Sequence, residues 1–111
     1  MKHEIIWSKD AADELFEIIS YIKYNTGKIT AEKIYSRIMK EVKRVSENPT
    51  ARKIAPMLKE VGINYIHQSN IDPWIIFYRA EKNKMEIISI IDGRRNLEEI
   101  LYRKMVDGKI T

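Results

Sequence analysis

The order of apolar and polar positions in the first half of the chain predicts one strand followed by two helices. The segment HEIIWS places His3, Ile5 and Trp7 at alternate positions, which is typical of a strand. Apolar residues then recur every three or four positions in two consecutive segments, and each set forms one stripe on a helix. The two stripes are Leu15, Ile18, Ile19 and Ile22, followed by Ile34, Ile38, Val42 and Val45. Because only a few residues connect the two segments, they predict an antiparallel helical hairpin.

Residues with capping or chain-breaking properties mark the expected ends of these helices. Ser8 can cap the first helix, with Asp10 in the first turn, where the helix dipole favours an anion. Gly27 can supply a left-handed stop at the other end. Thr30 can cap the second helix, which we expect to end before Pro49 because proline disfavours helix at the preceding residue.

The apolar period changes in the second half, where three segments are rich in β-branched and aromatic residues. They read GINYIHQS, PWIIFYRAE and KMEIISIID, and a polar turn at residues 82–84 joins the last two as a hairpin. Asn96 then begins NLEE, a capping box with Glu99, ahead of a short amphipathic helix. The sequence therefore predicts an α+β fold in a single domain, residues 1–111. Its expected parts are an N-terminal strand, an antiparallel helical hairpin, a three-stranded antiparallel meander and a short C-terminal helix.

Composition narrows the class of protein. The chain is 44% hydrophobic and 32% charged, as in an ordinary folded domain rather than a disordered one. It contains no cysteine, which excludes disulfides, a thiol nucleophile and cysteine-ligated zinc. The N-terminal residues lack the apolar segment of a signal peptide, and no run is long enough to span a membrane. We therefore expect a cytoplasmic protein with no membrane association.

The net charge of +4 at pH 7 suggests an anionic partner without identifying it. The excess of positive charge lies in two segments. Residues 49–60 contain 3 basic and 1 acidic residues, and residues 93–111 contain 5 basic and 3 acidic residues. Neither segment is a polybasic tail, so direct binding to duplex DNA is not expected.

Several signatures of known chemistry are absent from the sequence. It contains no Gly-rich phosphate loop, no G-x-S-x-G and no H-E-x-x-H. Its two histidines lie far apart in sequence without clustered partners, so we expect no metal site and no cofactor. Trp74, Phe77 and Tyr78 could stack on bases, but in an alternating strand we expect them in the core.

Arginines at a predicted strand-to-helix corner are the main candidates for binding. Arg94 and Arg95 follow the last strand in the sequence DGRRN, beside the start of the C-terminal helix. Arginine at such a place can hold a phosphate or carboxylate in two hydrogen bonds. The alternative is a structural ion pair between one arginine and Asp92 or Glu98, and the two arginines can also divide these roles.

Several motifs taken together resemble the RelE/ParE superfamily of type II toxin–antitoxin toxins. They are W-S-x-x-A-x-x-E-L at residues 7–15, the NP that ends the second helix, IIFYR at residues 75–79 and IIDGRRNLEEIL at residues 90–101. The similarity runs from about residue 4 to residue 102. It implies a small basic toxin, of the kind found in plasmid stabilisation systems, that a cognate antitoxin holds inactive.

The resemblance also implies the partners. The antitoxin would wrap the toxin with a partly disordered, often helical segment, which an apolar groove rimmed with basic residues would receive well. Contact with DNA would occur only through the antitoxin. The target would be either the ribosome and its mRNA or DNA gyrase, because RelE-like members cleave mRNA on the ribosome without metal and ParE-like members act on gyrase.

The RelE-like alternative assigns catalytic roles. Arg94 and Arg95 would contact the phosphate, and His67 or Tyr102 would transfer protons. Three further basic residues would bind the substrate or target: Arg79, Lys53 and Lys59. In the ParE-like alternative the same arginines are contact residues and none is catalytic. A third alternative is an inactive relative that binds only its antitoxin.

RelE-like toxins typically carry lysines and arginines on the middle strands, whereas this chain has YIHQSNIDPWIIFY there. The signature FYR…DGRRN slightly favours the ParE-like alternative.

Overall fold

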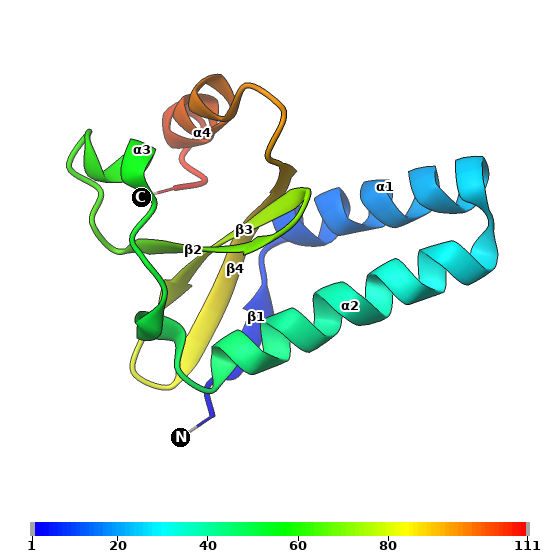
Figure 1. Cartoon of the computed structure of the whole chain (residues 1–111). Coiled ribbons are helices and arrows are strands. Elements are labelled where there is room, and N and C mark those ends of the chain that lie inside the picture. Colours follow the sequence, from blue (N-terminus) through cyan, green and yellow to red (C-terminus); the bar gives the residue numbers. More distant parts are fainter. Residues whose placement is uncertain (1, 111) are drawn as a thin grey trace.

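The computed structural model describes residues 2–110 and shows a four-stranded sheet with helices on both faces (Figure 1). The order of elements confirms the predicted α+β fold, with two additional short helical turns between the hairpin and the second strand. The elements are β1 (Glu4–Trp7), α1 (Lys9–Thr26), α2 (Lys28–Ser46), η1 (Pro49–Ala51), α3 (Pro56–Lys59), β2 (Ile66–Ile71), β3 (Trp74–Ala80), β4 (Lys84–Asp92) and α4 (Leu97–Val106).

The sheet has the order β1-β4-β3-β2. The last three strands form the predicted antiparallel meander, in which Tyr78 lies opposite both His67 and Ile87. The first strand pairs in parallel with β4, from Glu4 opposite Lys84 to Trp7 opposite Ile87. The N-terminal strand therefore lies beside the strand that leads to the arginine corner.

Of the predicted caps of the helical hairpin, the one at the start of α1 is confirmed and the one at the start of α2 is wrong. Ser8 caps α1, because its hydroxyl accepts the Ala11 N–H at 3.1 Å. Gly27 ends α1 and also begins α2, so Thr30 lies inside the first turn of α2 and is not its cap. The backbone of Gly27 has φ 109° and ψ 165°, a positive φ but not the left-handed helical conformation that we predicted.

The second strand begins later than its β-rich sequence predicts. β2 starts at Ile66, because residues 56–62 form α3 and the turn after it. A backbone bridge from Ile54 to His67 covers the outer edge of β2 at its start. Four residues of helix leave too short a period to recognise in the sequence, which is why α3 was not predicted.

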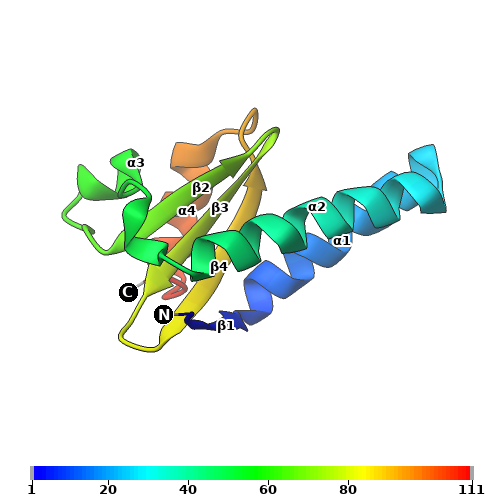
Figure 2. The same ribbon diagram turned by 60° about the horizontal axis from the view of Figure 1, so that its bottom comes forward.

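Two hydrophobic cores lie on opposite faces of the sheet. The first packs α1 and α2 against the sheet and includes Trp74 and Tyr78, whereas the second lies under α3 and α4 and includes Phe77 and Leu101. The three aromatic residues of β3 are thus core residues, as predicted. The α1–α2 hairpin extends well beyond the sheet (Figure 2). No helix among residues 2–110 is long and apolar enough to cross a membrane.

Candidate functional site

The corner between β4 and α4 is fixed to the turn between β2 and β3 through Gly93. Its backbone N–H donates to the Pro73 carbonyl oxygen at 2.7 Å. A Cβ atom at this position would lie 3.2 Å from a methyl group of Ile75 and 3.3 Å from the Pro73 oxygen, so the close approach favours glycine. Asn96 then caps α4 by accepting the Glu99 N–H at 3.2 Å, as predicted. The two arginines between these points therefore stand on a well-anchored turn.

Arg94 is engaged by a neighbouring carboxylate. Its guanidinium donates to both oxygens of Asp92, from Nε at 3.0 Å and from Nη2 at 2.6 Å, and its backbone N–H also donates to Oδ1. These hydrogen bonds lower the pKa of Asp92 from 3.8 to about 2. Arg94 therefore forms the structural ion pair with Asp92 that the sequence analysis gave as the alternative to binding an external anion.

Arg95 is presented outward. Its side chain is exposed and makes no ion pair or side-chain hydrogen bond within residues 2–110. It stands at the rim of two surface hollows, one towards the helical hairpin and one towards α4. The two adjacent arginines thus differ, and Arg95 is the one available to an external anion.

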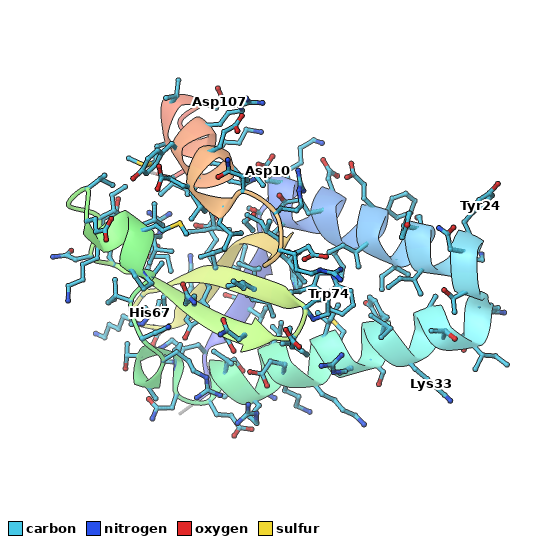
Figure 3. All side chains as sticks on the ribbon, turned by 45° about the horizontal axis from the view of Figure 1, so that its top comes forward. Asp10, Tyr24, Lys33, His67, Trp74 and Asp107 are labelled. Atoms are coloured by element: carbon cyan, nitrogen blue, oxygen red, sulfur yellow. The ribbon has the colours of Figure 1, made fainter. Side chains whose placement is uncertain are left out.

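One of these hollows is a largely apolar groove of about 640 Å³, here called the hairpin groove. It lies between the overhanging part of α1 and α2 and the end of the sheet, where Trp74 is seen in Figure 3. Arg94 and Arg95 stand at one side of it and Glu14 and Glu17 at another. Its main apolar lining residues are Ile18, Tyr21, Ile22, Ile34, Trp74 and Ile90.

An ionic cluster holds α4 against the start of α1, next to the corner. Lys104 is only 8% exposed and contacts Asp10 at 2.6 Å and Glu14 at 3.1 Å. Lys109 also contacts Asp10 at 2.6 Å, and hydrogen bonds from Lys104 and Lys109 lower the pKa of Asp10. Glu14 in turn accepts hydrogen bonds from the Ser89 hydroxyl and from a backbone N–H of β4. The sequence analysis did not find Lys104, because its partners lie 90 or more residues earlier in the chain.

The other candidates for catalysis or target binding on the strands are held in place by neighbouring groups. His67 donates from Nδ1 to the Arg52 carbonyl oxygen at 2.8 Å, and its ring stacks on Tyr78 with centroids 5.5 Å apart. Arg79 forms an ion pair with Glu86 at 2.8 Å. Both residues have structural contacts that account for their positions.

The register of the sheet separates these residues from the corner. Asp92 lies opposite Trp74, which lies opposite Ile71 at the end of β2. His67 lies four positions along β2 from Ile71, or about 13 Å. Arg79 lies one register position further away than His67. The fold thus leaves His67 and Arg79 towards the end of the sheet opposite to the corner that carries Arg94 and Arg95.

The remaining candidates lie outside the sheet. Tyr102 is partly buried on α4 beside a shallow hollow, and Lys53 and Lys59 are exposed in the connector before β2. A small cavity of about 160 Å³ lies between the connector, the sheet and α4. Its lining is apolar except for Gln68, so it offers no cluster of cations to a phosphate.

A further charged surface on α2 escaped the sequence analysis. Its basic residues recur with helical spacing on one side of the helix: Lys33, Arg37, Lys40 and Arg44. Counting charge over residues 1–48 hides this set, because 9 basic and 8 acidic residues nearly cancel there. The period of the basic positions along α2, rather than their sum, is the signal that would have found them.

A four-stranded sheet with a helical hairpin on one face and a basic strand-to-helix corner defines the chain as a RelE/ParE-type protein. The family model described as "ParE toxin of type II toxin-antitoxin system, parDE" matches residues 5–97, and the chain belongs to this family. This confirms the resemblance inferred from the sequence motifs.

The solved structures contain a similar fold. A chain described as "Chromosomal ParDE TA system from P. aeruginosa" matches with a TM-score of 0.67 and 17% sequence identity, over 82% of this chain and 96% of that chain. At this identity the match supports the shared fold. No curated protein sequence matches the chain significantly.

Proposed function

We propose that this type II toxin acts by binding DNA gyrase rather than by cleaving RNA, and that a cognate antitoxin keeps it inactive. The observation that carries the proposal is the position of Arg95, which is exposed at the corner and far from His67, one of the two candidates for proton transfer. The other candidate, Tyr102, lines a different surface hollow from the two that Arg95 lines. Membership of the ParE family supports the same choice of target.

Metal-free RNA cleavage needs a base, a proton donor and cations around one phosphate. His67 lies four positions along β2 from the end of the sheet that carries the arginine corner, about 13 Å away, and Arg79 is neutralised by Glu86. This separation does not favour a nuclease centre. A binding protein needs only an exposed cation beside a surface of suitable shape, which Arg95 and its surroundings supply.

Inhibition of DNA supercoiling tests the proposed target. We expect the purified chain to inhibit supercoiling of a relaxed plasmid by gyrase, and Arg95→Ala to raise the concentration for half-inhibition roughly tenfold. Arg103→Ala is the matched control, because Arg103 is also an exposed arginine near the corner but is paired with Glu99. It should leave inhibition unchanged.

A parallel assay on ribosomes separates the alternatives. Ribosomes stalled on a defined mRNA should keep the message intact when the chain is added. Cuts in the A-site codon that disappear in Arg95→Ala would establish the RelE-like activity and overturn the proposal. If the chain affects neither gyrase nor mRNA and is harmless when expressed alone, it is the inactive relative instead.

The hairpin groove is the proposed binding site for the antitoxin segment. An amphipathic helix could place its apolar residues against Ile18, Tyr21 and Trp74, with an acidic residue near Arg95. A segment that is disordered before binding would gain its stability from covering this surface.

Two aromatic residues of α1 provide a matched test of this site. Tyr21 lines the groove and is 70% exposed, whereas Phe16 is 73% exposed and does not line it. The partner would be the product of a neighbouring small reading frame that encodes an acidic, helical protein. Tyr21→Glu should weaken the complex tenfold or more, and Phe16→Glu should leave it unchanged. Equal effects of the two substitutions would place the antitoxin elsewhere.

A further inference from the structure

Four cations form a straight stripe along one side of α2. Lys33, Arg37, Lys40 and Arg44 occupy positions i, i+4, i+7 and i+11, and these four residues are here called the α2 stripe. Eleven residues of helix span about 17 Å. Lys33 extends from α2 into solvent (Figure 3). The stripe lies far along the chain from the arginine corner and belongs to a different surface hollow.

Contacts to neighbouring elements position the two arginines of the stripe. Arg37 donates from Nη2 to the Asp72 carbonyl oxygen at 2.9 Å. Arg44 contacts Glu41 at 2.7 Å, and Glu41 also accepts the Ser69 hydroxyl at 2.6 Å. Arg37 therefore keeps its charge, because its partner is a backbone carbonyl, whereas Arg44 is ion-paired with Glu41.

The two lysines of the stripe carry uncompensated charge. Lys33 and Lys40 are exposed, and neither forms an ion pair within residues 2–110. The stripe borders an open hollow of about 620 Å³ on the side of β2. Of the described residues that line this hollow, Ile71 is the apolar one, and it is 8% exposed.

The chemistry of this surface favours a phosphate backbone over other anionic partners. A protein partner is normally held by buried aromatic or apolar anchors, and the hollow has none that is exposed. A single-stranded nucleic acid is normally held by aromatic side chains that stack on its bases, and the lining contains no aromatic residue. Duplex DNA needs neither, because contacts between its phosphates and basic side chains supply its non-specific affinity.

We propose that the α2 stripe binds the phosphate backbone of duplex DNA without sequence preference. This differs from the expectations drawn from the sequence, in which the chain does not bind duplex DNA directly and contact with DNA occurs only through the antitoxin. The charge counts behind the first expectation hid the α2 stripe. The proposal does not depend on gyrase as the target, since a chain that leaves gyrase active could still bind DNA through α2.

The salt dependence of binding tests the proposal. Binding of the full chain to two fluorescein-labelled 20-base-pair duplexes of unrelated sequence would be measured by fluorescence anisotropy across a series of NaCl concentrations. Phosphate contacts from the three residues of the stripe without an ion pair, Lys33, Arg37 and Lys40, predict a slope of log K against log [NaCl] of about −3. Both duplexes should give the same affinity.

Paired substitutions locate the contact. Lys33→Ala/Lys40→Ala should weaken binding about tenfold and make the slope shallower by about 2. Lys82→Ala/Lys84→Ala removes the same charge from exposed lysines at the β3–β4 turn and should leave the slope unchanged. Lys33→Arg/Lys40→Arg keeps the charge and should restore both affinity and slope. Circular dichroism of each variant checks that the helices are intact.

Three outcomes would overturn the proposal. The wild-type chain could fail to bind duplex at the lowest salt concentration, or the two alanine pairs could reduce the slope equally, which would indicate a general effect of net charge. Poly-glutamate or a single-stranded RNA could compete for the stripe more strongly than unlabelled duplex, which would identify an acidic protein segment or RNA as the occupant.

Discussion

At the corner after β4, the position of one carboxylate gives two neighbouring arginines different properties. The carboxylate of Asp92 accepts three hydrogen bonds from Arg94, whereas Arg95 donates its backbone N–H to the Asp92 carbonyl oxygen at 3.1 Å and no side-chain hydrogen bond to the carboxylate. The sequence identified both arginines and the possible ion pair. It could not assign them, because the choice depends on how the turn at Gly93 orients each side chain.

The ion pair makes a prediction for the titration of Asp92. Its pKa should be about 2 in the folded chain, and Arg94→Gln should return it part of the way towards 3.8, because the guanidinium hydrogen bonds are lost and the one from the backbone N–H remains. Carboxyl ¹³C chemical shifts measured against pH would check this, with Arg103→Gln as the control. An unchanged titration of Asp92 in Arg94→Gln would contradict the assigned pair.

The lowered pKa of Asp92 also predicts how the stability of the folded chain depends on pH. The pKa of Asp92 is lower in the folded chain than in the unfolded chain, so its contribution is present above about pH 4 and is lost as pH falls towards 2. Comparison of urea unfolding of the wild type and Arg94→Gln over this range should show the two curves converging at the acid end.

At the scale of single elements, the junction between α1 and α2 depends on one residue. Gly27 has φ 109° and ψ 165°, a conformation that is nearly restricted to glycine. Gly27→Ala should therefore lower the free energy of unfolding by about 2 kcal/mol. Gly27→Asn should do the same, because asparagine tolerates the left-handed helical region but not this one. Urea unfolding would measure both, and a wild-type stability for the asparagine variant would show that the junction is left-handed after all.

The buried lysine of α4 makes a second prediction at this scale. Lys104→Met leaves Glu14 without its ion-pair partner and Asp10 with only Lys109. We expect the free energy of unfolding to fall by about 2 kcal/mol. This is less than for a fully buried ion pair, because both carboxylates are still partly exposed to water. Arg103→Met is the control, since Arg103 forms an exposed pair on the same helix and should lose less than about 0.5 kcal/mol. Equal losses in urea unfolding would show that the cluster does not hold α4.

The helix caps show which structural features can be predicted from a few neighbouring residues of the sequence. Ser8 and Asn96 were predicted as caps because each acts on an N–H group three residues away. Thr30 has the same local signal but is not a cap, since Gly27 starts α2 earlier and its carbonyl accepts the Ala31 N–H. A capping residue identifies a possible helix start, and competition with a nearby glycine decides whether it is used.

At the scale of the whole molecule, the features that the sequence did not reveal are those that join distant segments. The parallel pairing of Glu4 with Lys84 and the contact of Lys104 with Asp10 each connect residues 80 or more positions apart. No local period encodes such pairings. The hairpin groove is of the same kind, because Tyr21 and Arg95 come together only when α1 packs across the end of β4.

The shape of the molecule predicts an uneven distribution of local stability. The tip of the hairpin projects beyond the sheet (Figure 2). Tyr24, near this tip, is 90% exposed. Amides in residues 20–32 should therefore exchange with deuterium at least about tenfold faster than those of β3 and β4, because only the opposite helix supports them. Hydrogen exchange followed by mass spectrometry would measure this.

The same experiment connects stability to partner binding. One wall of the hairpin groove is formed by Tyr21, Ile22 and Thr30, which lie in this less stable part of the chain. A partner segment in the groove should slow exchange in residues 20–32 and leave β3 unchanged, since the strands are already protected. Uniform protection along the hairpin in the free chain, or a partner that slows exchange only elsewhere, would mean that the overhanging tip is rigid without a partner or is not where the partner binds.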